Sequence, residues 1–228
     1  TPPAFTLGDP SWLAHRMDRA GDAVRFHHVP RARHGQIPFL TDDYIGDAAM
    51  VVEPMAGAQA GLADMSPAPL HFIFHSAFCA STLLCRALDA PGVMMGLSEP
   101  VMLNDIVGFR RRGEVDARGA GQMFDTALAL LARPWGEGEA VVVKPSNVLN
   151  PVAAGLMTLR PHARAIVMTA PLPIFLASVA RKGMWCRLWV RELLEGMVAD
   201  GAVQLGFDGP ALFRLTDLQV AAVGWLAQ

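Results

Sequence analysis

The pattern of hydrophobic positions divides the chain into short apolar runs and longer segments with helical spacing. Apolar runs of strand length lie at residues 70–75, 93–96, 140–143 and 163–168. Segments with apolar residues three or four positions apart lie between and after these runs, at residues 81–89, 122–132, 152–159 and 171–182. Strands that alternate with helices predict an α/β fold with a doubly wound parallel sheet flanked by helices.

The first 69 residues carry a weaker pattern. Helical spacing over residues 11–20 predicts a short helix, and alternation of apolar and polar residues over 24–29 predicts a half-buried strand. Proline and glycine punctuate the stretch that follows, which has helical spacing only at 41–49. We expect residues 1–69 to be an N-terminal extension packed on a main domain of residues 70–228.

The end of the chain is predicted to be helical. From Trp185 onward the apolar spacing favours helices, and residues 218–228 form an amphipathic pattern with no stop signal behind it. We therefore expect either that the natural protein continues past Gln228 or that a C-terminal part of the main domain is missing here.

Composition and charge narrow the classes of partner. The chain has 228 residues, of which 52% are hydrophobic, and a net charge of −2. This balance gives no indication of a nucleic-acid or membrane partner, and no apolar run is long enough to span a bilayer. The three cysteines lack zinc-ligand spacing, so we expect a cytoplasmic protein without a bound metal. The high apolar content also fits a homodimer interface.

Ligands of parallel α/β sheets bind at the carboxyl ends of the strands. Three segments of the chain are predicted to meet at that edge, namely residues 75–82, 144–147 and 169–178. The first combines small and hydroxyl residues directly before a helix. A helix N-terminus offers free backbone N–H groups and a partial positive charge, so with Ser81 and Thr82 it suits a phosphate or sulfate group. The alternative is that Ser81 simply caps the helix.

Two other known anion-binding motifs fit this stretch less well. The Gly-Lys pair of the Walker A motif is absent. Cys79 lies where a helix N-terminus could activate a thiolate, but Arg86 follows it by seven positions, one more than cysteine-dependent phosphatases require. A small buried cysteine is the favoured interpretation of Cys79.

An ordered set of short motifs resembles the sulfotransferase family, in particular the branch of tyrosylprotein sulfotransferases and many bacterial members. The match covers about residues 70–183. Its first half consists of Phe78-Cys79-Ala80-Ser81-Thr82-Leu83-Leu84, Leu88-Asp89 and Leu97-Ser98-Glu99-Pro100. Its second half consists of Lys144-Pro145, Pro161-His162-Ala163-Arg164 and Ser178 ahead of Arg181-Lys182.

The resemblance implies a P-loop-like fold that binds 3′-phosphoadenosine 5′-phosphosulfate and transfers its sulfuryl group to a hydroxyl or amine of a small molecule or peptide. It implies that Glu99 is the general base and that Lys144 stabilises the charge on the transferring group. Ser178 matches the serine that contacts the 3′-phosphate. The donor-binding loop corresponds to Ala77, Phe78, Cys79, Ala80, Ser81 and Thr82.

Three departures from the family pattern leave alternatives open. Phe78 replaces the basic residue of the loop, Ala80 replaces its glycine, and Ala170 replaces an arginine of the 3′-phosphate segment. Either other cations compensate, or the donor differs, or the chain is an anion-binding module without catalysis. The candidate cations are Lys144 first, then Arg86, Arg164, Arg181 and Arg187. A phosphoryl-transfer enzyme is less favoured, because no Asp stands at a strand end to hold Mg²⁺.

Overall fold

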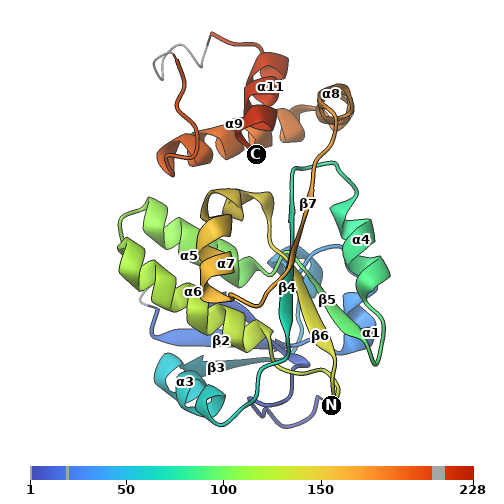
Figure 1. Cartoon of the computed structure of the whole chain (residues 1–228), viewed down its shortest axis with the longest axis vertical. Helices are drawn as coiled ribbons and strands as arrows, with labels where there is room; N and C mark the ends of the chain where they lie inside the picture. Colours follow the sequence, from blue (N-terminus) through green and yellow to red (C-terminus); the bar gives the residue numbers. More distant parts are fainter. Residues whose placement is uncertain (1, 19–20, 207–213) are drawn as a thin grey trace.

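The structure of the chain is a computed structural model that describes residues 2–18, 21–206 and 214–228. It has a parallel sheet in the middle, an antiparallel sheet formed by the N-terminal segment, and a group of helices at the C-terminal end (Figure 1).

The parallel sheet has four strands in the order β5-β6-β4-β7. They are β4 (Leu70–His75), β5 (Met94–Ser98), β6 (Ala140–Lys144) and β7 (Ala165–Met168). All three neighbouring pairs run parallel. The two central strands, β4 and β6, are buried almost throughout, as expected for parallel strands covered on both faces. The four strands predicted from apolar runs are therefore confirmed.

Helices cover both faces of this sheet (Figure 1). One face carries α4 (Ser81–Leu88), which follows β4. The other face carries α5 (Val101–Arg111), α6 (Ala117–Leu131) and α7 (Ala153–Leu159), the last preceded by a 3-10 helix at Asn147–Val152. The predicted doubly wound α/β fold is confirmed. Because the neighbouring strands β4 and β6 connect to helices on opposite faces, a crevice opens between their carboxyl ends.

The short helix expected at residues 11–20 is wrong, although residues 19 and 20 lie outside the described part. Trp12–Met17 forms strand β1, which pairs antiparallel with β2 (Ala23–His28). Leu13, Ala14 and Met17 have helix-like spacing, but five of the six residues of β1 are buried, so apolar residues on both faces of the strand contribute to the core. The strand expected at residues 24–29 is confirmed as β2.

A third strand, β3 (Met50–Pro54), completes the antiparallel sheet beside β2. The helices of this segment are α1 (Arg31–His34), α2 (Asp42–Ile45) and α3 (Met55–Ala63), so the helix expected at 41–49 is shorter than predicted. One hydrophobic cluster contains Phe26 of β2, Leu103 of α5 and Val143 of β6. The two sheets therefore share one core.

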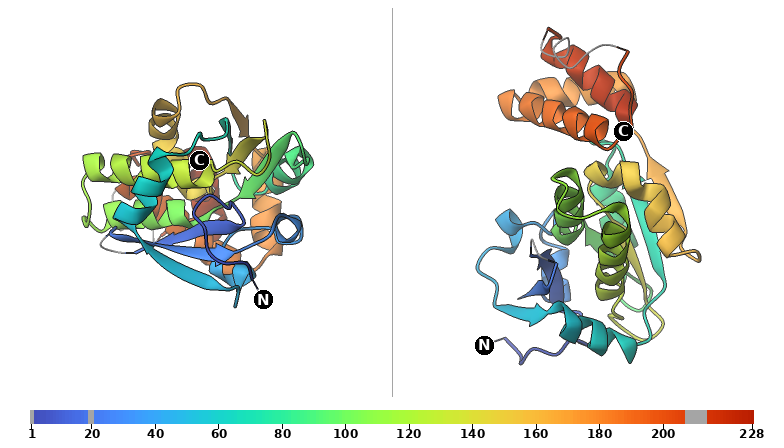
Figure 2. Two further views of the ribbon diagram at one scale, coloured as in Figure 1. Left: turned by 90° about the horizontal axis from the view of Figure 1, so that it is seen from below. Right: turned by 90° about the vertical axis from the view of Figure 1, so that its left-hand side faces the viewer.

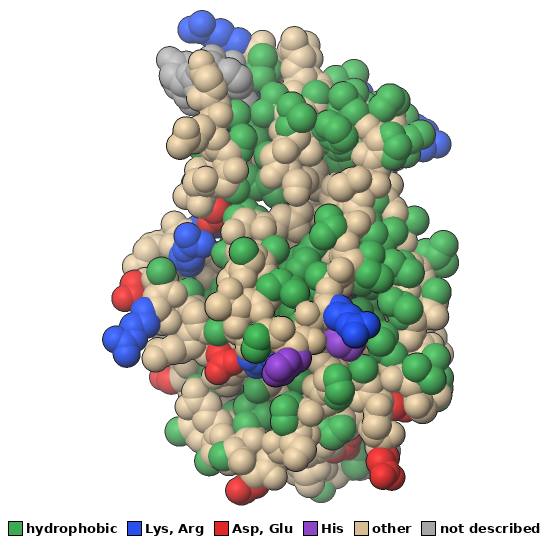
Figure 3. Space-filling view, viewed as in Figure 1, with side chains coloured by type: hydrophobic (Ala, Val, Ile, Leu, Met, Phe, Trp, Pro, Cys, Tyr) green, Lys and Arg blue, Asp and Glu red, His purple; other side chains and the backbone are tan. Residues whose placement is uncertain are grey.

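The C-terminal helices α8 (Leu172–Arg181), α9 (Met184–Ala199) and α11 (Asp217–Ala227) stand beyond the carboxyl ends of the parallel strands (Figures 1 and 2). They pack on one another through a separate small cluster that includes Phe175, Val179 and Val190. Hydrophobic side chains remain visible over these helices in the space-filling view (Figure 3). Within the described residues, no helix combines the length and apolarity needed to cross a membrane.

Candidate functional site

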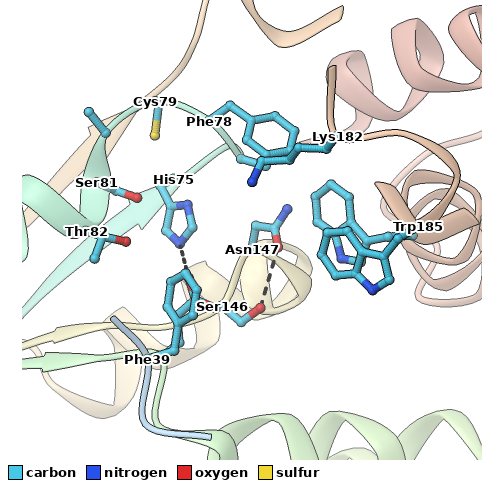
Figure 4. Close-up of a pocket in the computed structure, with 14 residues that line it drawn as sticks. Phe39, His75, Phe78, Cys79, Ser81, Thr82, Ser146, Asn147, Lys182 and Trp185 are labelled. Carbon is cyan, nitrogen blue, oxygen red and sulfur yellow. Dashed lines mark hydrogen bonds and ion pairs between the residues drawn. The ribbon is translucent and has the colours of Figure 1, made fainter. Parts of the chain in front are cut away.

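A pocket of about 320 Å³ opens at the carboxyl ends of β4, β5 and β6. Its floor is formed by residues 77–82 after β4, by Glu99 after β5, and by Ser146 and Asn147 after β6. The C-terminal helices supply its opposite wall (Figure 4). Six predicted donor-binding residues and Glu99 thus line one cavity.

The loop after β4 holds two residues in the left-handed backbone region, Phe78 at φ 62° and Ala80 at φ 64°. Glu99, across the pocket, has φ 53°. Side chains with a Cβ seldom adopt such angles, and residues that do so cluster at functional sites. The Cβ of alanine disfavours a positive φ, yet the loop adopts that conformation with Ala80 in place of the glycine of the family pattern.

Helix α4 begins at the edge of the pocket without a side-chain cap. Its N-cap residue is Ala80, and no side chain in the described part of the chain bonds to the first turn. Ser81 is the first helical residue and is buried, so it is not the N-cap that the alternative interpretation required. The first-turn N–H groups therefore remain available for an anion at the pocket edge.

Lys144 lies behind Glu99, fully buried at 0% exposure. Its Nζ atom forms an ion pair with the Glu99 carboxylate and lies 3.2 Å from His75 Nε2. It also lies 5.4 Å from the centroid of the Phe39 ring. Burial, and next the neighbouring Lys144 cation, lowers the pKa of His75, which favours its neutral form. Glu99, His75 and Phe39 line the pocket, whereas Lys144 lies behind these three side chains and does not line it itself.

Lys182 lines the pocket, although the sequence motifs gave it no role at the site. Its Nζ atom lies 5.6 Å from the centroid of the Phe78 ring (Figure 4). Within residues 2–18, 21–206 and 214–228 it forms no ion pair. The arginines considered as substitutes for the loop cation do not line this pocket. The sequence contains only two lysines, and that scarcity, together with the place of Lys182 in the Arg181-Lys182 pair, could have singled out Lys182.

Phe78 occupies the loop position at which the resemblance expects a basic residue. Its ring packs at 5.5 Å from Phe175 and at 5.9 Å from Trp189, measured between centroids. It therefore joins the hydrophobic cluster of the C-terminal helices. The side chain anchors the loop to α8 and α9, and the positive charge next to it comes from Lys182.

Aromatic side chains from distant segments complete the wall. Phe39 comes from the N-terminal segment and is held in place because Leu40 N–H donates to the Ser98 carbonyl at the end of β5. Trp185 and Trp189 of α9 stack with nearly parallel rings, 6.5 Å between centroids, and Trp185 is 68% exposed. No motif in the sequence pointed to these three residues.

Ser178 does not lie with the other predicted site residues. It is a half-buried residue of α8 whose hydroxyl donates to the Ile174 carbonyl at 2.9 Å, and it does not line the pocket. Ala170 is buried, and its N–H donates to Ser76 Oγ at 3.0 Å. Residues 169–178, which were predicted to meet the other two segments at the site, therefore do not line the pocket, and the cation of this part of the chain is Lys182 at the end of α8. The role of Ser178 at a 3′-phosphate stays a prediction.

Cys79 lines the pocket, and its thiol donates to the Ser76 carbonyl at 2.9 Å. Arg86 points elsewhere, so the pair does not form the cysteine-arginine arrangement of a phosphatase. In the part of the chain that the structure describes, no three His, Cys, Asp or Glu side chains are grouped closely enough to hold a metal ion. Comparison with protein-family models, with curated proteins and with solved structures gave no match.

Proposed function

We propose that this chain is a sulfotransferase-like enzyme with a P-loop-like fold, whose pocket binds the phosphosulfate end of 3′-phosphoadenosine 5′-phosphosulfate. The observation that carries the proposal is the meeting of three groups at one cavity. These are the uncapped start of α4 behind the left-handed Ala80, the Glu99 carboxylate, and the Lys182 ammonium. The position of the cavity between β4 and β6, at the crevice of the sheet, supports the same conclusion.

The anion would be held by backbone and side-chain donors together. The first-turn amides of α4 and the hydroxyls of Ser81 and Thr82 supply hydrogen bonds. Lys182 supplies the full positive charge that Phe78 cannot. A charged donor strengthens a hydrogen bond to phosphate or sulfate by about twofold over a neutral donor.

Glu99 would act as the general base. It accepts the proton of the acceptor hydroxyl while the acceptor oxygen forms a bond to sulfur and the bond from sulfur to the bridging oxygen breaks. The products are a sulfate ester and 3′-phosphoadenosine 5′-phosphate; an amine acceptor would yield a sulfamate. Lys144 positions the Glu99 carboxylate through their ion pair, which replaces the direct contact with the transferring group that the resemblance implied.

A second candidate is an anion-binding module that carries out no transfer. Two observations favour it: the 3′-phosphate end of the donor finds no cation at Ala170, and Lys144 is sequestered behind Glu99. Both candidates bind the anion through the same groups, which are the first turn of α4 and Lys182. They differ in whether bound donor is turned over, so one set of experiments separates them.

The binding test is a calorimetric and thermal-shift titration with 3′-phosphoadenosine 5′-phosphate, with ATP plus Mg²⁺ and sulfate as comparisons. A ligand that binds only the folded state raises its apparent stability. We expect selective stabilisation by the bisphosphate and about tenfold weaker binding by Lys182→Ala, because one charged contact is lost. Arg181→Ala removes the same charge from the neighbouring exposed position outside the pocket and should leave binding unchanged.

The catalytic test follows sulfur-labelled donor with a panel of hydroxyl and amine acceptors. We expect Glu99→Gln to retain affinity for the bisphosphate and to lose transfer by about a hundredfold or more, as removal of a general base does. Wild-type rates in that variant would remove Glu99 from the mechanism. Binding without turnover by the native chain would establish the second candidate instead, and stabilisation by ATP plus Mg²⁺ alone would point to phosphoryl transfer.

A further inference from the structure

The last turn of α11 lies against the segments that follow three of the parallel strands. After β4, Ala77 N–H donates to Gln228 Oε1 at 2.9 Å. After β6, Asn147 Nδ2 donates to the same oxygen at 2.6 Å. Before α8, the Ala170 carbonyl accepts a hydrogen bond from Trp225 Nε1 at 2.6 Å. The last turn of α11 is thus hydrogen-bonded to the segments that follow β4, β6 and β7.

The Gln228 oxygen links two parts of the pocket floor, although Gln228 itself does not line the pocket. Ala77 and Asn147 are both pocket residues, and they are 70 positions apart in the chain. The amide of Gln228 is oriented by its other end, because Nε2 donates to the Gly224 carbonyl of the same helix at 3.2 Å. Its oxygen therefore points at the rim, where its two lone pairs accept both hydrogen bonds.

We propose that Gln228 is a positioning residue for the anion-binding loop. Ala77 N–H is the first amide of the segment that leads through the left-handed Phe78 and Ala80 to the start of α4. Fixing that amide against Asn147 holds the strained loop in the conformation that turns the first-turn amides of α4 toward the pocket. This inference rests on the proposed function of the pocket, but the placement of the loop can be measured without any ligand.

The first test is hydrogen-deuterium exchange of the full ligand-free chain. Gln228→Leu keeps a side chain of similar size and removes the acceptor. We expect exchange of peptides over residues 76–84 and 146–150 to rise by about tenfold, because each segment loses a part-buried hydrogen bond. Gln228→Glu keeps an acceptor for both bonds and should restore protection. Leu226→Ala, at an exposed position of the same turn, is the control and should behave as wild type.

Unchanged exchange in Gln228→Leu would overturn the proposal. A rise of the same size in α5, remote from the contact, would also overturn it, since that result means only a general loss of stability. If Gln228→Glu fails to restore protection, the lost hydrogen-bond acceptor is not the cause of the faster exchange in Gln228→Leu, and the proposal is also overturned.

The second test measures affinity for 3′-phosphoadenosine 5′-phosphate and for sulfate. We expect Gln228→Leu to bind both about tenfold more weakly than wild type, with Leu226→Ala unchanged. If the native chain binds neither ligand, the proposed function fails, while the exchange experiment still decides whether Gln228 fixes the loop. If the native chain binds and Gln228→Leu binds equally well, the positioning role is excluded although the function stands.

Discussion

Ala80 adopts a backbone conformation that costs an L-residue roughly 1–2 kcal/mol relative to the right-handed region. Phe78, two positions earlier, and Glu99, across the pocket, share that property. Backbone strain of this kind persists only where the surrounding contacts determine it. Here the contacts are the packing of Phe78 on the C-terminal helices, the bond from Ala77 to Gln228, and the ion pair of Glu99 with Lys144.

Relief of the strain at Ala80 should stabilise the fold. We expect Ala80→Gly to raise the free energy of unfolding by about 1 kcal/mol, because glycine adopts a φ of this sign without a Cβ clash. Ala87→Gly places the same substitution at an exposed position in the last turn of α4 and should lower the free energy of unfolding by about 0.5–1 kcal/mol. Equilibrium unfolding in guanidinium chloride measures both. A loss of stability in Ala80→Gly would show that the loop conformation is not strained.

The sequence identifies site residues where local structure alone determines their position. Ser81 and Thr82 follow a buried strand and start a helix, so their place at the rim follows from chain order. Lys182 could not be found in this way, since it reaches Phe78 only through the packing of α8 and α9 over the sheet. Ser178 shows the converse, because a serine that matches the family pattern in type lies outside the pocket and donates its hydroxyl to the Ile174 carbonyl of its own helix.

At the scale of elements, buried parallel strands are the part of the fold best predicted from sequence. The run at 140–143 and the one at 70–75 are nearly continuous apolar segments, which is typical of strands buried on both faces. Strand β1 and helix α5 (Val101–Arg111) are instead stabilised by packing on each other. The pattern of apolar residues in each segment, taken alone, does not distinguish a helix from a strand. The antiparallel sheet was therefore only partly predicted.

Helix α4 lies close to the sheet because Gly96 of β5 has no side chain. A Cβ at position 96 would approach the Cys85 carbonyl to 2.6 Å, which requires the backbone to shift. We expect Gly96→Ala to lower the free energy of unfolding by about 2 kcal/mol, as overpacking in a core typically does. Gly96→Ala should also weaken ligand binding, since the first turn of α4 carries the proposed anion-binding groups.

Gly155→Ala is the matched control for this substitution. Gly155 lies in α7, and a Cβ there meets no atom within 4 Å. Alanine at that position should stabilise the protein by about 0.5–1 kcal/mol through helix propensity. Denaturant unfolding of both variants provides the comparison. Equal effects of the two substitutions would contradict the close approach of α4 and β5.

At the scale of the whole molecule, the N-terminal segment contributes buried histidines to the shared core. Burial lowers the pKa of His15 and of His34 to about 4. A hydrogen bond from His15 to Asp42 opposes that shift without cancelling it. Both imidazoles are therefore neutral in the folded protein near pH 6, where an unfolded chain already begins to protonate them.

This difference predicts a loss of stability in mild acid. Between about pH 6.5 and pH 4 the unfolded state binds more protons than the folded state, so the free energy of unfolding falls as the pH is lowered. The expected slope is up to about 1.4 kcal/mol per pH unit for each histidine. Urea unfolding at pH 7, 6 and 5 should show a shallower slope in His34→Gln than in wild type. His162→Gln, at an exposed position, should keep the wild-type slope; a flat profile in wild type would contradict the prediction.

The packing of Phe78 has a consequence for how this pocket can be re-engineered. Its ring is part of the hydrophobic cluster of the C-terminal helices, and Lys182 lies over it. Phe78→Arg alone would lose the ring contacts with Phe175 and Trp189 and would place a guanidinium beside a second cation, so a single step toward a basic loop loses packing and adds charge repulsion. Selection for a charged loop would therefore have to change the loop, its aromatic neighbours and Lys182 together, which makes the present distribution of charge difficult to reverse one substitution at a time.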